Sequence, residues 1–367
     1  MKFICNKNEL NEAINNVSRA VSPKSTIAAL EGIRVKVSEG EVELTGYNLE
    51  MGIRTTIKAE THDEGEFVVS SRLFNEFTRR MNDDEITMSI DDNLVITITG
   101  SNTDCSFSAM SADEYPDLPV VDNQRCFTVK QTTLRSMINQ TSYAASTNES
   151  KPVLTGELFD IADGKFNLVA IDGFRLAIRS ELTECSETYH FVVPKKALQE
   201  VSTLIKDDSD KVCTICTNDR HIIFEVNNVF VISRLLEGAF HNYKLSIPTS
   251  YKTEVIISKK DLSNCLERCS LIIDDKNKSP IRCEIGGGVV KISCKTGIGR
   301  VNDAISADTT GDAVTIGYNN KLMLEALRAA EGDKVKIRLN GAMKVIEMLP
   351  LEGESYIFLV MPIQLKN

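Results

Sequence analysis

The sequence predicts an α+β protein of three tandem domains, each made of two β-rich halves with one helix apiece. The first observation is a threefold repeat, in which Phe3–Leu10 returns as Phe127–Leu134 and again as Val255–Leu262. The copies are spaced by 124 and 128 residues, which is the size of a whole domain. The second observation is that apolar runs of period 2 alternate with stripes of helical period inside each copy. At 367 residues the chain is long enough to give every copy its own core.

Each repeat opens with a short strand that leads into a helix. These helices are expected at residues 8–20, 131–146 and 259–271, because apolar residues recur there at positions i, i+3, i+4 and i+7. The residues at these positions are Leu10, Ala13, Ile14 and Val17, then Leu134, Met137, Ile138 and Thr141, then Leu262, Cys265, Leu266 and Cys269. One face of each helix is therefore predicted to be buried.

A second helix is expected late in each repeat, at residues 71–82, 194–206 and 319–330. The central apolar residues of these helices, at equal spacings of 124, are Phe74, Leu198 and Leu322. Each helix follows a short β-rich run. Ser71 and Asn319 are expected as N-terminal caps, and Pro194 suits a first helical turn.

Strands are expected to fill the remainder of each repeat. Runs rich in β-branched residues are Ile33–Val37, Glu41–Thr45, Leu94–Thr99 and Ile222–Val226. Tight turns between such runs are expected at Glu39-Gly40, Asp163-Gly164 and Gly286–Gly288. We therefore predict two antiparallel β-sheets and two helices per domain. The linkers near Asn123–Cys126 and Pro248–Tyr251 place the domains at residues 1–124, 125–249 and 250–367.

Composition argues for a protein that works in the cytoplasm. The longest apolar runs, such as Tyr356–Met361, are far shorter than the roughly 20 residues needed to cross a bilayer. Met1–Cys5 is followed at once by polar residues, so no signal peptide is expected. The ten cysteines are scattered and mostly lie within apolar patterns. We expect them to be reduced core residues.

Charge is distributed unevenly between helices and the rest of the chain. The six expected helices carry a formal +6 and everything else −16, for a net charge of −10. If the helices share one surface, that surface would attract a polyanion that the rest of the protein repels. No aromatic residues interleave with the basic ones, so contacts would go to phosphates without sequence preference. The alternative is that these are ordinary solvated helices.

No catalytic or metal-binding constellation stands out. Cys213 and Cys216 form a C-x-x-C, but they lie in a strand-like run without a second pair at zinc spacing. The four histidines form no metal motif, and the glycine-rich segments lack the Lys-Ser/Thr of a phosphate loop. The acidic pairs Asp91-Asp92 and Asp274-Asp275 fall at expected turns or element ends. We predict no metal and no cofactor.

Four local motifs, in this order and over the whole chain, resemble the bacterial sliding-clamp family, the beta subunits of DNA polymerase III. The motifs are Phe107-Ser with Asp113–Leu118, Lys151–Gly156, Val169–Leu176 and Val360–Leu365. The resemblance implies a head-to-tail homodimer that closes into a six-domain ring around double-stranded DNA, bound without regard to sequence. It also implies that the ring tethers a DNA polymerase III alpha-type subunit, the clamp loader and other proteins carrying a clamp-binding motif. It implies no catalytic activity.

The resemblance also implies three groups of site residues. The DNA-facing residues would be Lys24, Arg72, Arg79, Arg80, Lys151 and Lys196. The subunit contact would place Leu271 and Ile272 of one copy against Phe107 and Met110 of the other. The partner-peptide pocket, between the second and third domains, would comprise Leu154, Ile171, Gly173, Phe174, Arg175, Leu176, Asn319, Leu322, Val360, Met361, Pro362 and Ile363.

In that pocket, apolar side chains would receive apolar anchors of the peptide, while Arg175 and Asn319 would fix its backbone. The chain departs from the family pattern at His241–Leu245, which lacks the usual proline and arginine, and at Lys366 and Asn367, which extend the C-terminus. Two other functions fit the residues alone. One is an α+β enzyme with a carboxylate or metal site at a domain interface, and the other is a three-domain adhesion or scaffold protein that does not bind DNA.

Overall fold

The structure is a computed structural model that describes residues 1–122, 124–206, 211–273 and 279–365. Asn123, the pair Asp274 and Asp275, and the terminal Lys366 and Asn367 lie outside the described residues. By packing, the chain divides into two compact units. One comprises Met1–Arg135 with Lys196–Leu235, and the other comprises Ser136–Lys195 with Leu236–Asn367.

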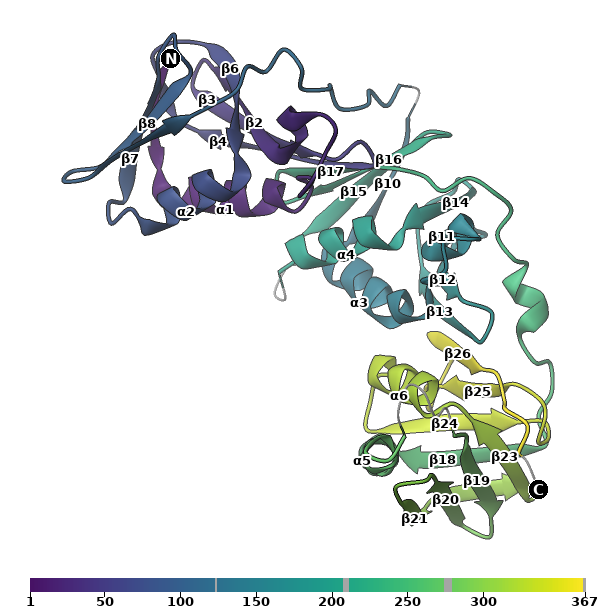
Figure 1. The fold of residues 1–367 in the computed structure, drawn as a ribbon. Coiled ribbons are helices and arrows are strands. Elements are labelled where there is room, and N and C mark those ends of the chain that lie inside the picture. Colours follow the sequence, from purple (N-terminus) through teal and green to yellow (C-terminus); the bar gives the residue numbers. More distant parts are fainter. Residues whose placement is uncertain (123, 207–210, 274–278, 366–367) are drawn as a thin grey trace. The chain divides into compact units, whose positions relative to one another are not determined.

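The first repeat contains nine strands and two helices (Figure 1). In chain order they are β1 (Lys2–Asn6), α1 (Lys7–Ser18), β2 (Gly32–Ser38), β3 (Glu41–Tyr47), β4 (Met51–Lys58), β5 (Glu60–Thr61), β6 (Gly65–Ser70), α2 (Ser71–Arg80), β7 (Glu85–Ile90), β8 (Val95–Thr99) and β9 (Asp104–Ser108). The apolar stripe of α1 is buried as predicted, at Leu10, Ala13, Ile14 and Val17. Each such Leu, Ile or Val contributes about 1.5–3 kcal/mol by leaving water.

The second repeat follows the same order of elements. It contains β10 (Arg125–Lys130), α3 (Gln131–Thr141), β11 (Gly156–Ala162), β12 (Lys165–Ile171), β13 (Arg175–Leu182), β14 (Tyr189–Pro194), α4 (Lys195–Leu204), β15 (Val212–Thr217), β16 (His221–Val226) and β17 (Val229–Arg234). The predicted turn at Asp163-Gly164 joins β11 to β12, with both residues at positive φ. Asn and Asp tolerate this conformation and glycine favours it, which is why the pair works as a two-residue hairpin loop.

The third repeat ends with a strand that lies in the long apolar run Tyr356–Met361. It contains β18 (Thr253–Ser258), α5 (Lys259–Ser270), β19 (Ile281–Gly286), β20 (Val289–Lys295), β21 (Arg300–Ser306), β22 (Asp308–Gly311), β23 (Val314–Tyr318), α6 (Asn320–Ala329), β24 (Lys334–Leu339), β25 (Ile346–Leu349) and β26 (Tyr356–Val360). Short 3₁₀ turns occur at Ala28–Glu31, Ser142–Ala144, Pro152–Thr155 and Tyr243–Ser246. In the described part of the chain, no helix combines the length and apolarity needed to cross a membrane.

The strands form four antiparallel sheets, because two of the sheets run from one repeat into the next. The order in the eight-stranded sheet is β10-β15-β16-β17-β4-β3-β2-β6, and in the nine-stranded sheet it is β14-β11-β12-β13-β26-β25-β24-β18-β22. The five-stranded sheet, β5-β1-β7-β8-β9, belongs to the first repeat alone, and the four-stranded sheet, β21-β20-β19-β23, to the third. The middle repeat therefore contributes one half to each large sheet.

The helices are shorter than the apolar pattern predicted, because it runs past the last helical hydrogen bond. The helix expected at 131–146 ends at Thr141 and continues as a 3₁₀ turn. The cap expected at Ser71 is Ser70, whose hydroxyl accepts from the amide of Leu73, while Asn319 caps α6 as predicted. Pro194 ends β14 rather than lying in the first helical turn.

One expectation about the cysteines is wrong. Cys126 and Cys216 form a disulfide, because they lie directly opposite each other on β10 and β15. Cys213, the other member of the C-x-x-C, is a free thiol buried on the opposite side of β15, as period-2 alternation requires. Cys105 and Cys185 are only partly buried, whereas the remaining free thiols are core residues.

Candidate functional site

The C-terminal segment brings together residues that are far apart in the sequence. The amide of Met361 donates to the carbonyl of Phe174 at 2.8 Å, and that of Ile363 donates to the carbonyl of Gly317 at 2.7 Å. Pro362 lies opposite Tyr318 in an isolated β-bridge. Gly317 permits this close approach, since a Cβ there would lie 2.4 Å from the carbonyl oxygen of Ile363. The segment thus connects the start of β13 with the end of β23.

The turn before β13 presents an apolar side chain to solvent. The carboxylate of Asp172 accepts from the amides of Phe174 and Arg175, at 2.8 and 3.0 Å. Gly173 has φ +92°, and the position of a β-carbon there is open space. Another residue at this position would therefore be strained by its backbone conformation and not by a clash. Phe174 is 66% exposed, and Met361 beside it is 47% exposed. Two large apolar side chains are therefore available for contact at this point.

The other apolar members of the predicted pocket differ in depth. Leu176 is buried with Leu359 in a cluster against which Ile171 packs. Val360 is buried in the sheet between Arg175 and Ile346. Leu154 is half-buried, and Leu322 packs against the core of the third repeat instead. The structure thus brings Ile171, Phe174, Leu176 and the C-terminal segment into one neighbourhood, while Val360 and Leu322 both belong to the second apolar cluster.

Arg175 and Asn319 are already engaged by the chain itself. The guanidinium of Arg175 pairs with Asp172 at 3.0 Å and with Glu325 of α6, and it stacks on the ring of Tyr143 at 5.2 Å. Burial raises the pKa of the Tyr143 phenol well above its usual value, so this ring stays neutral. The side chain of Asn319 accepts from the amide of Lys321 at 2.9 Å. A bound peptide would therefore share these groups with existing partners.

All six predicted DNA-facing side chains are exposed. They are Lys24, Arg72, Arg79, Arg80, Lys151 and Lys196. Arg79 and Arg80 both pair with Glu76 on the same helix, so part of their charge is offset. Lys24, Arg72 and Lys196 make no ion pair with the described residues. Lys151 belongs to the other compact unit.

Within the first unit, helices of the first and second repeats lie together. Helix α1 packs on α2, as Figure 1 shows for the two helices beside the strands of the first repeat. Arg19, just after α1, pairs with Glu200 of α4 at 3.2 Å, and Glu12 pairs with Lys206 at 3.3 Å. In the second unit α5 packs on α6, and Arg328 pairs with Glu267 at 3.3 Å. Inside each unit, helices therefore lie side by side, as a shared basic surface would need.

Of the four residues of the predicted subunit contact, Phe107 lies on an edge strand of a small sheet, whereas Met110, Leu271 and Ile272 lie outside the named strands. Phe107 is on β9 and stacks on Phe77, with ring centroids 5.2 Å apart. Met110 pairs with Val68 through backbone hydrogen bonds of 2.8 and 2.9 Å. Leu271 is 80% exposed at the end of α5, and Ile272 packs on the core of the third repeat. Only Leu271 thus leaves its whole side chain free.

The sheet order contains a repeated junction that the sequence did not reveal. The last strand of the third repeat, β26, pairs with β13 of the second, and the last strand of the second, β17, pairs with β4 of the first. The strands β4, β13 and β21 begin at Met51, Arg175 and Arg300, so they are equivalent in the repeat. The last strand of the first repeat, β9, ends the five-stranded sheet, and the fourth strand of the third repeat, β21, ends the four-stranded sheet. Each has one free edge among the described residues.

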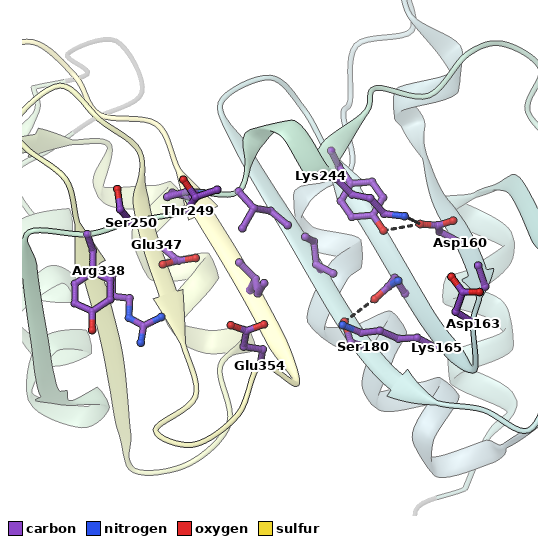
Figure 2. A pocket seen from close by; sticks show the side chains of 18 residues that line it. Asp160, Asp163, Lys165, Ser180, Lys244, Thr249, Ser250, Arg338, Glu347 and Glu354 are labelled. Atoms are coloured by element: carbon purple, nitrogen blue, oxygen red, sulfur yellow. Dashed lines mark hydrogen bonds and ion pairs between the residues drawn. The ribbon is translucent and has the colours of Figure 1, made fainter.

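Two cavities of the second unit are lined by none of the twelve residues of the predicted pocket. The larger of these two, about 730 Å³, lies between a face of the nine-stranded sheet and the segment Tyr243–Tyr251 (Figure 2). Its polar residues include Asp160, Lys165 and Glu347. No motif indicated it, because it depends on strands from two repeats. In the described ranges, no group of three or more His, Cys, Asp or Glu side chains is placed to hold a metal ion.

Comparison with family models gives one result for all three repeats. Models of the N-terminal, central and C-terminal domains of the DNA polymerase III beta subunit match residues 1–119, 128–242 and 244–364.

Whole-chain comparisons agree with these matches. The chain is 30% identical to the beta sliding clamp of Staphylococcus epidermidis over 375 residues, covering 99% of each protein. It is 30% identical over 379 residues to the beta sliding clamp of Halalkalibacterium halodurans. Among solved structures, the DNA polymerase sliding clamp from Bacillus subtilis matches with a TM-score of 0.96 at 28% identity, over 100% of both chains. The beta subunit of DNA polymerase from Streptococcus pyogenes matches with a TM-score of 0.95 at 26% identity, again over 100% of both chains.

Proposed function

The chain belongs to the family of DNA polymerase III beta subunits, the beta sliding clamps, and we propose that two copies close head to tail into a ring around duplex DNA. The ring is a processivity factor, which tethers a polymerase to its template by topology. It is not an enzyme, because the proteins of this family are sliding clamps without a catalytic site of their own. The enzyme and scaffold alternatives are therefore not retained.

The single observation that carries the closure is the repeated strand junction. Inside one chain, the last strand of a repeat always pairs with the fourth strand of the preceding one, as β17 with β4 and β26 with β13. The same rule assigns β9 of one copy to β21 of another, and two such contacts close a ring. Phe107 lies on β9, and Leu271 ends the helix that packs on β21. We therefore assign Phe107, Met110, Leu271 and Ile272 to the contact.

We assign DNA contact to the exposed basic side chains on the helices and adjoining loops. These are Lys24, Arg72, Arg79, Arg80, Lys151 and Lys196. Their exposure and the positive charge of the helices support contact with phosphates, which carry no sequence information. Such contacts leave the ring free to slide along the duplex.

We assign capture of partner proteins to the neighbourhood of the C-terminal segment. A DNA polymerase III alpha-type subunit, the clamp loader and other proteins with a clamp-binding motif would each present a short apolar segment there. The exposed side chains of Phe174 and Met361 support this assignment, and Leu176 and Ile171 form the apolar floor beneath them. Apolar anchors of this kind carry most of the energy of a small interface. We retain domain limits of 1–124, 125–249 and 250–367, and a cytoplasmic location, as parts of this proposal.

The test is retention on DNA of different topology. Labelled protein is loaded by the clamp loader onto nicked circular DNA, separated from free protein, and followed before and after the circle is cut. We expect it to remain on the circle and to be lost from the linear product. Protein that stays on linear DNA with free ends would contradict the topological mechanism.

A pair of variants connects this result with the subunit contact. Leu271→Asp places a carboxylate in the proposed contact and should weaken the dimer at least about tenfold, with loss of retention on the circle. Leu182→Asp is the matched control, since Leu182 is 90% exposed on β13 and lies outside the assigned contact. Sedimentation equilibrium reports the mass of both.

A further inference from the structure

The cavity of about 730 Å³ in the second unit lies on a sheet surface whose charges are incompletely paired. In Figure 2 the side chains of Asp160, Asp163 and Lys165 lie on one side of it, and those of Arg338, Glu347 and Glu354 on the other. The segment Tyr243–Tyr251 crosses between them, and a second cavity of about 360 Å³ on this segment also reaches Arg338 and Glu347. The volume of the larger cavity is ample for one long side chain.

Glu347 is a largely buried residue whose carboxylate opens onto the cavity without an ion pair of its own. It is only 6% exposed, yet it makes no hydrogen bond or ion pair with the described residues, and its side chain lines both cavities. The strand register explains why. Arg338 lies between Glu254 on one neighbouring strand and Glu347 on the other, and its guanidinium bonds to Glu254 at 2.9 Å. One cation therefore serves a row of two carboxylates, and it forms its hydrogen bond with Glu254 only.

The other cations that line the cavity do not form an ion pair with Glu347. Lys244 pairs with Asp160 at 3.1 Å, so this lysine is already engaged. The hydroxyl of Tyr243 also donates to Asp160, at 2.6 Å. The remaining lining carboxylates are those of Asp163, Glu347 and Glu354. Lys165 is the one lining cation without an ion pair in the described structure. The carboxylate of Glu347 therefore has no ion-pair partner among the lining residues, and a cation that enters beside it would gain a charge-assisted hydrogen bond.

The cavity and the proposed peptide site share one apolar cluster. Ile178, Ile247 and Ile357 line the cavity and belong to the same apolar cluster as Leu176 and Ile171. A polypeptide whose apolar anchors rest on Leu176 would therefore carry its neighbouring residues toward the cavity mouth. A long basic side chain could place its methylene groups on the isoleucines and its charge near Glu347.

We propose that this cavity binds the cationic end of an arginine or lysine side chain from a protein docked at the neighbouring peptide site, with Glu347 as its counter-ion. This assignment rests on the proposed capture of partner proteins and adds a charged subsite to it. Burial raises the pKa of the Glu347 carboxyl, with Glu354 adding to the effect and Arg338 opposing it. That direction agrees with a carboxylate whose partner arrives from outside.

The first experiment tests the cavity without any peptide site. The full-length protein, labelled at isoleucine δ1 methyls, is titrated with Nα-acetyl-arginine amide, with the lysine analogue, and with Nα-acetyl-citrulline amide, which has the same shape without the charge. We expect saturable methyl shifts at Ile178, Ile247 and Ile357 with the two cations, at about millimolar affinity for so small a ligand. The citrulline compound should give none at the same concentrations, and Ile33 in the first unit should not respond.

Variants then identify the counter-ion. Glu347→Gln should weaken the arginine compound about tenfold or more, because a charge-assisted hydrogen bond is lost. Glu352→Gln is the matched control, an exposed carboxylate of the next loop that lines neither cavity, and it should leave the titration unchanged. Equal shifts with citrulline, no saturable shift, or an unchanged titration of Glu347→Gln would each overturn the proposal. The citrulline comparison uses the unaltered protein, so it decides even if the variant fails to fold.

The second experiment separates a protein side chain from a free small cation. A clamp-binding peptide is prepared with arginine or with citrulline beside its anchors, and both are measured against the unaltered protein and Glu347→Gln. We expect the arginine advantage to disappear in the variant. If the acetyl-arginine compound binds but the peptide shows no such coupling, the assignment to a partner side chain is wrong. If neither peptide binds at all, the proposed peptide site fails, while the first experiment still reports on the cavity.

Discussion

Glu157 shows how a single buried group links the second repeat to pH. It lies on β11 with its side chain fully buried, and the hydroxyls of Thr141 and Ser142 donate to its two carboxylate oxygens. Burial raises the pKa of the Glu157 carboxyl to about 7, although both hydroxyls and the charge of Lys195 act in the other direction. The fold is therefore favoured when this carboxyl is protonated, because burial penalises the charged form more than the two hydroxyl hydrogen bonds stabilise it.

The first prediction concerns this carboxyl. Between its ordinary pKa near 4.5 and its raised value of about 7, the folded protein holds a proton that the unfolded chain has released. The contribution to stability is complete below the lower value and is lost as pH rises through the upper one. Relative to Glu157→Gln, the unaltered protein should lose up to about 3 kcal/mol of unfolding free energy across this range.

Urea unfolding of both proteins at several pH values measures that difference. Glu149→Gln, a change at an exposed carboxylate in the following loop, should run parallel to the unaltered protein. If Glu157→Gln also runs parallel, the carboxyl does not titrate in this range.

Met361 is the residue at which the peptide site can be tested with least damage to the fold. Its amide holds the C-terminal segment to Phe174, whereas its side chain is 47% exposed. Met361→Ala keeps the amide and removes the apolar contact, so affinity for a clamp-binding peptide should fall about tenfold. Calorimetry measures the change. Met343→Ala, at an exposed methionine outside the site, is the control, and an equal loss in both variants would argue against the assignment.

At the scale of elements, α2 shows why a formal charge count overstates the field of a helix. Arg79 and Arg80 share Glu76 as a partner, while Arg72 in the first turn is exposed and has no ion pair with the described residues. Exposed pairs of this kind contribute little to stability but do reduce the charge presented to a ligand. Arg72 is therefore expected to contribute most of the phosphate contact of this helix.

The salt dependence of binding tests that expectation. Arg72→Gln should lower the slope of log affinity against log salt concentration, for a short duplex, by about 0.9. Lys36→Gln removes an exposed charge of the same unit, from strand β2, and should leave the slope unchanged. Fluorescence anisotropy at several salt concentrations distinguishes the two. An unchanged slope for Arg72→Gln would remove this residue from the DNA contact.

Elements were predicted better than their ends. The stripes at Leu10, Leu134 and Leu262 and the turn at Asp163-Gly164 depend on residues within one helical turn or one hairpin, so the pattern contains the information. Helix ends depend on which side chain reaches a free amide, and Ser70 reaches one where Ser71 was expected. The candidate peptide residues on the C-terminal segment were located by resemblance, whereas the pairing of Arg175 with Glu325 was not visible from the pattern.

At the scale of the whole molecule, the repeat does not predict the number of sheets. Three similar domains suggested six separate sheets, but the middle repeat gives its two halves to its neighbours, and four sheets result. Each junction buries strand edges that would otherwise be open to aggregation. The edges left at β9 and β21 are the ones that a second copy can close.

The sequence by itself determined the number of domains, the type and order of their elements, and the separation of basic helices from acidic strands. These follow from periodicity, turn chemistry and composition, all of which are local or additive. Only the tertiary structure decided that Cys126 bonds to Cys216, that strands of different repeats share a sheet, and that Arg338 bonds to Glu254 and not to Glu347. Each of these depends on which strand lies beside which, across separations such as 84 and 90 residues, where no periodic signal extends.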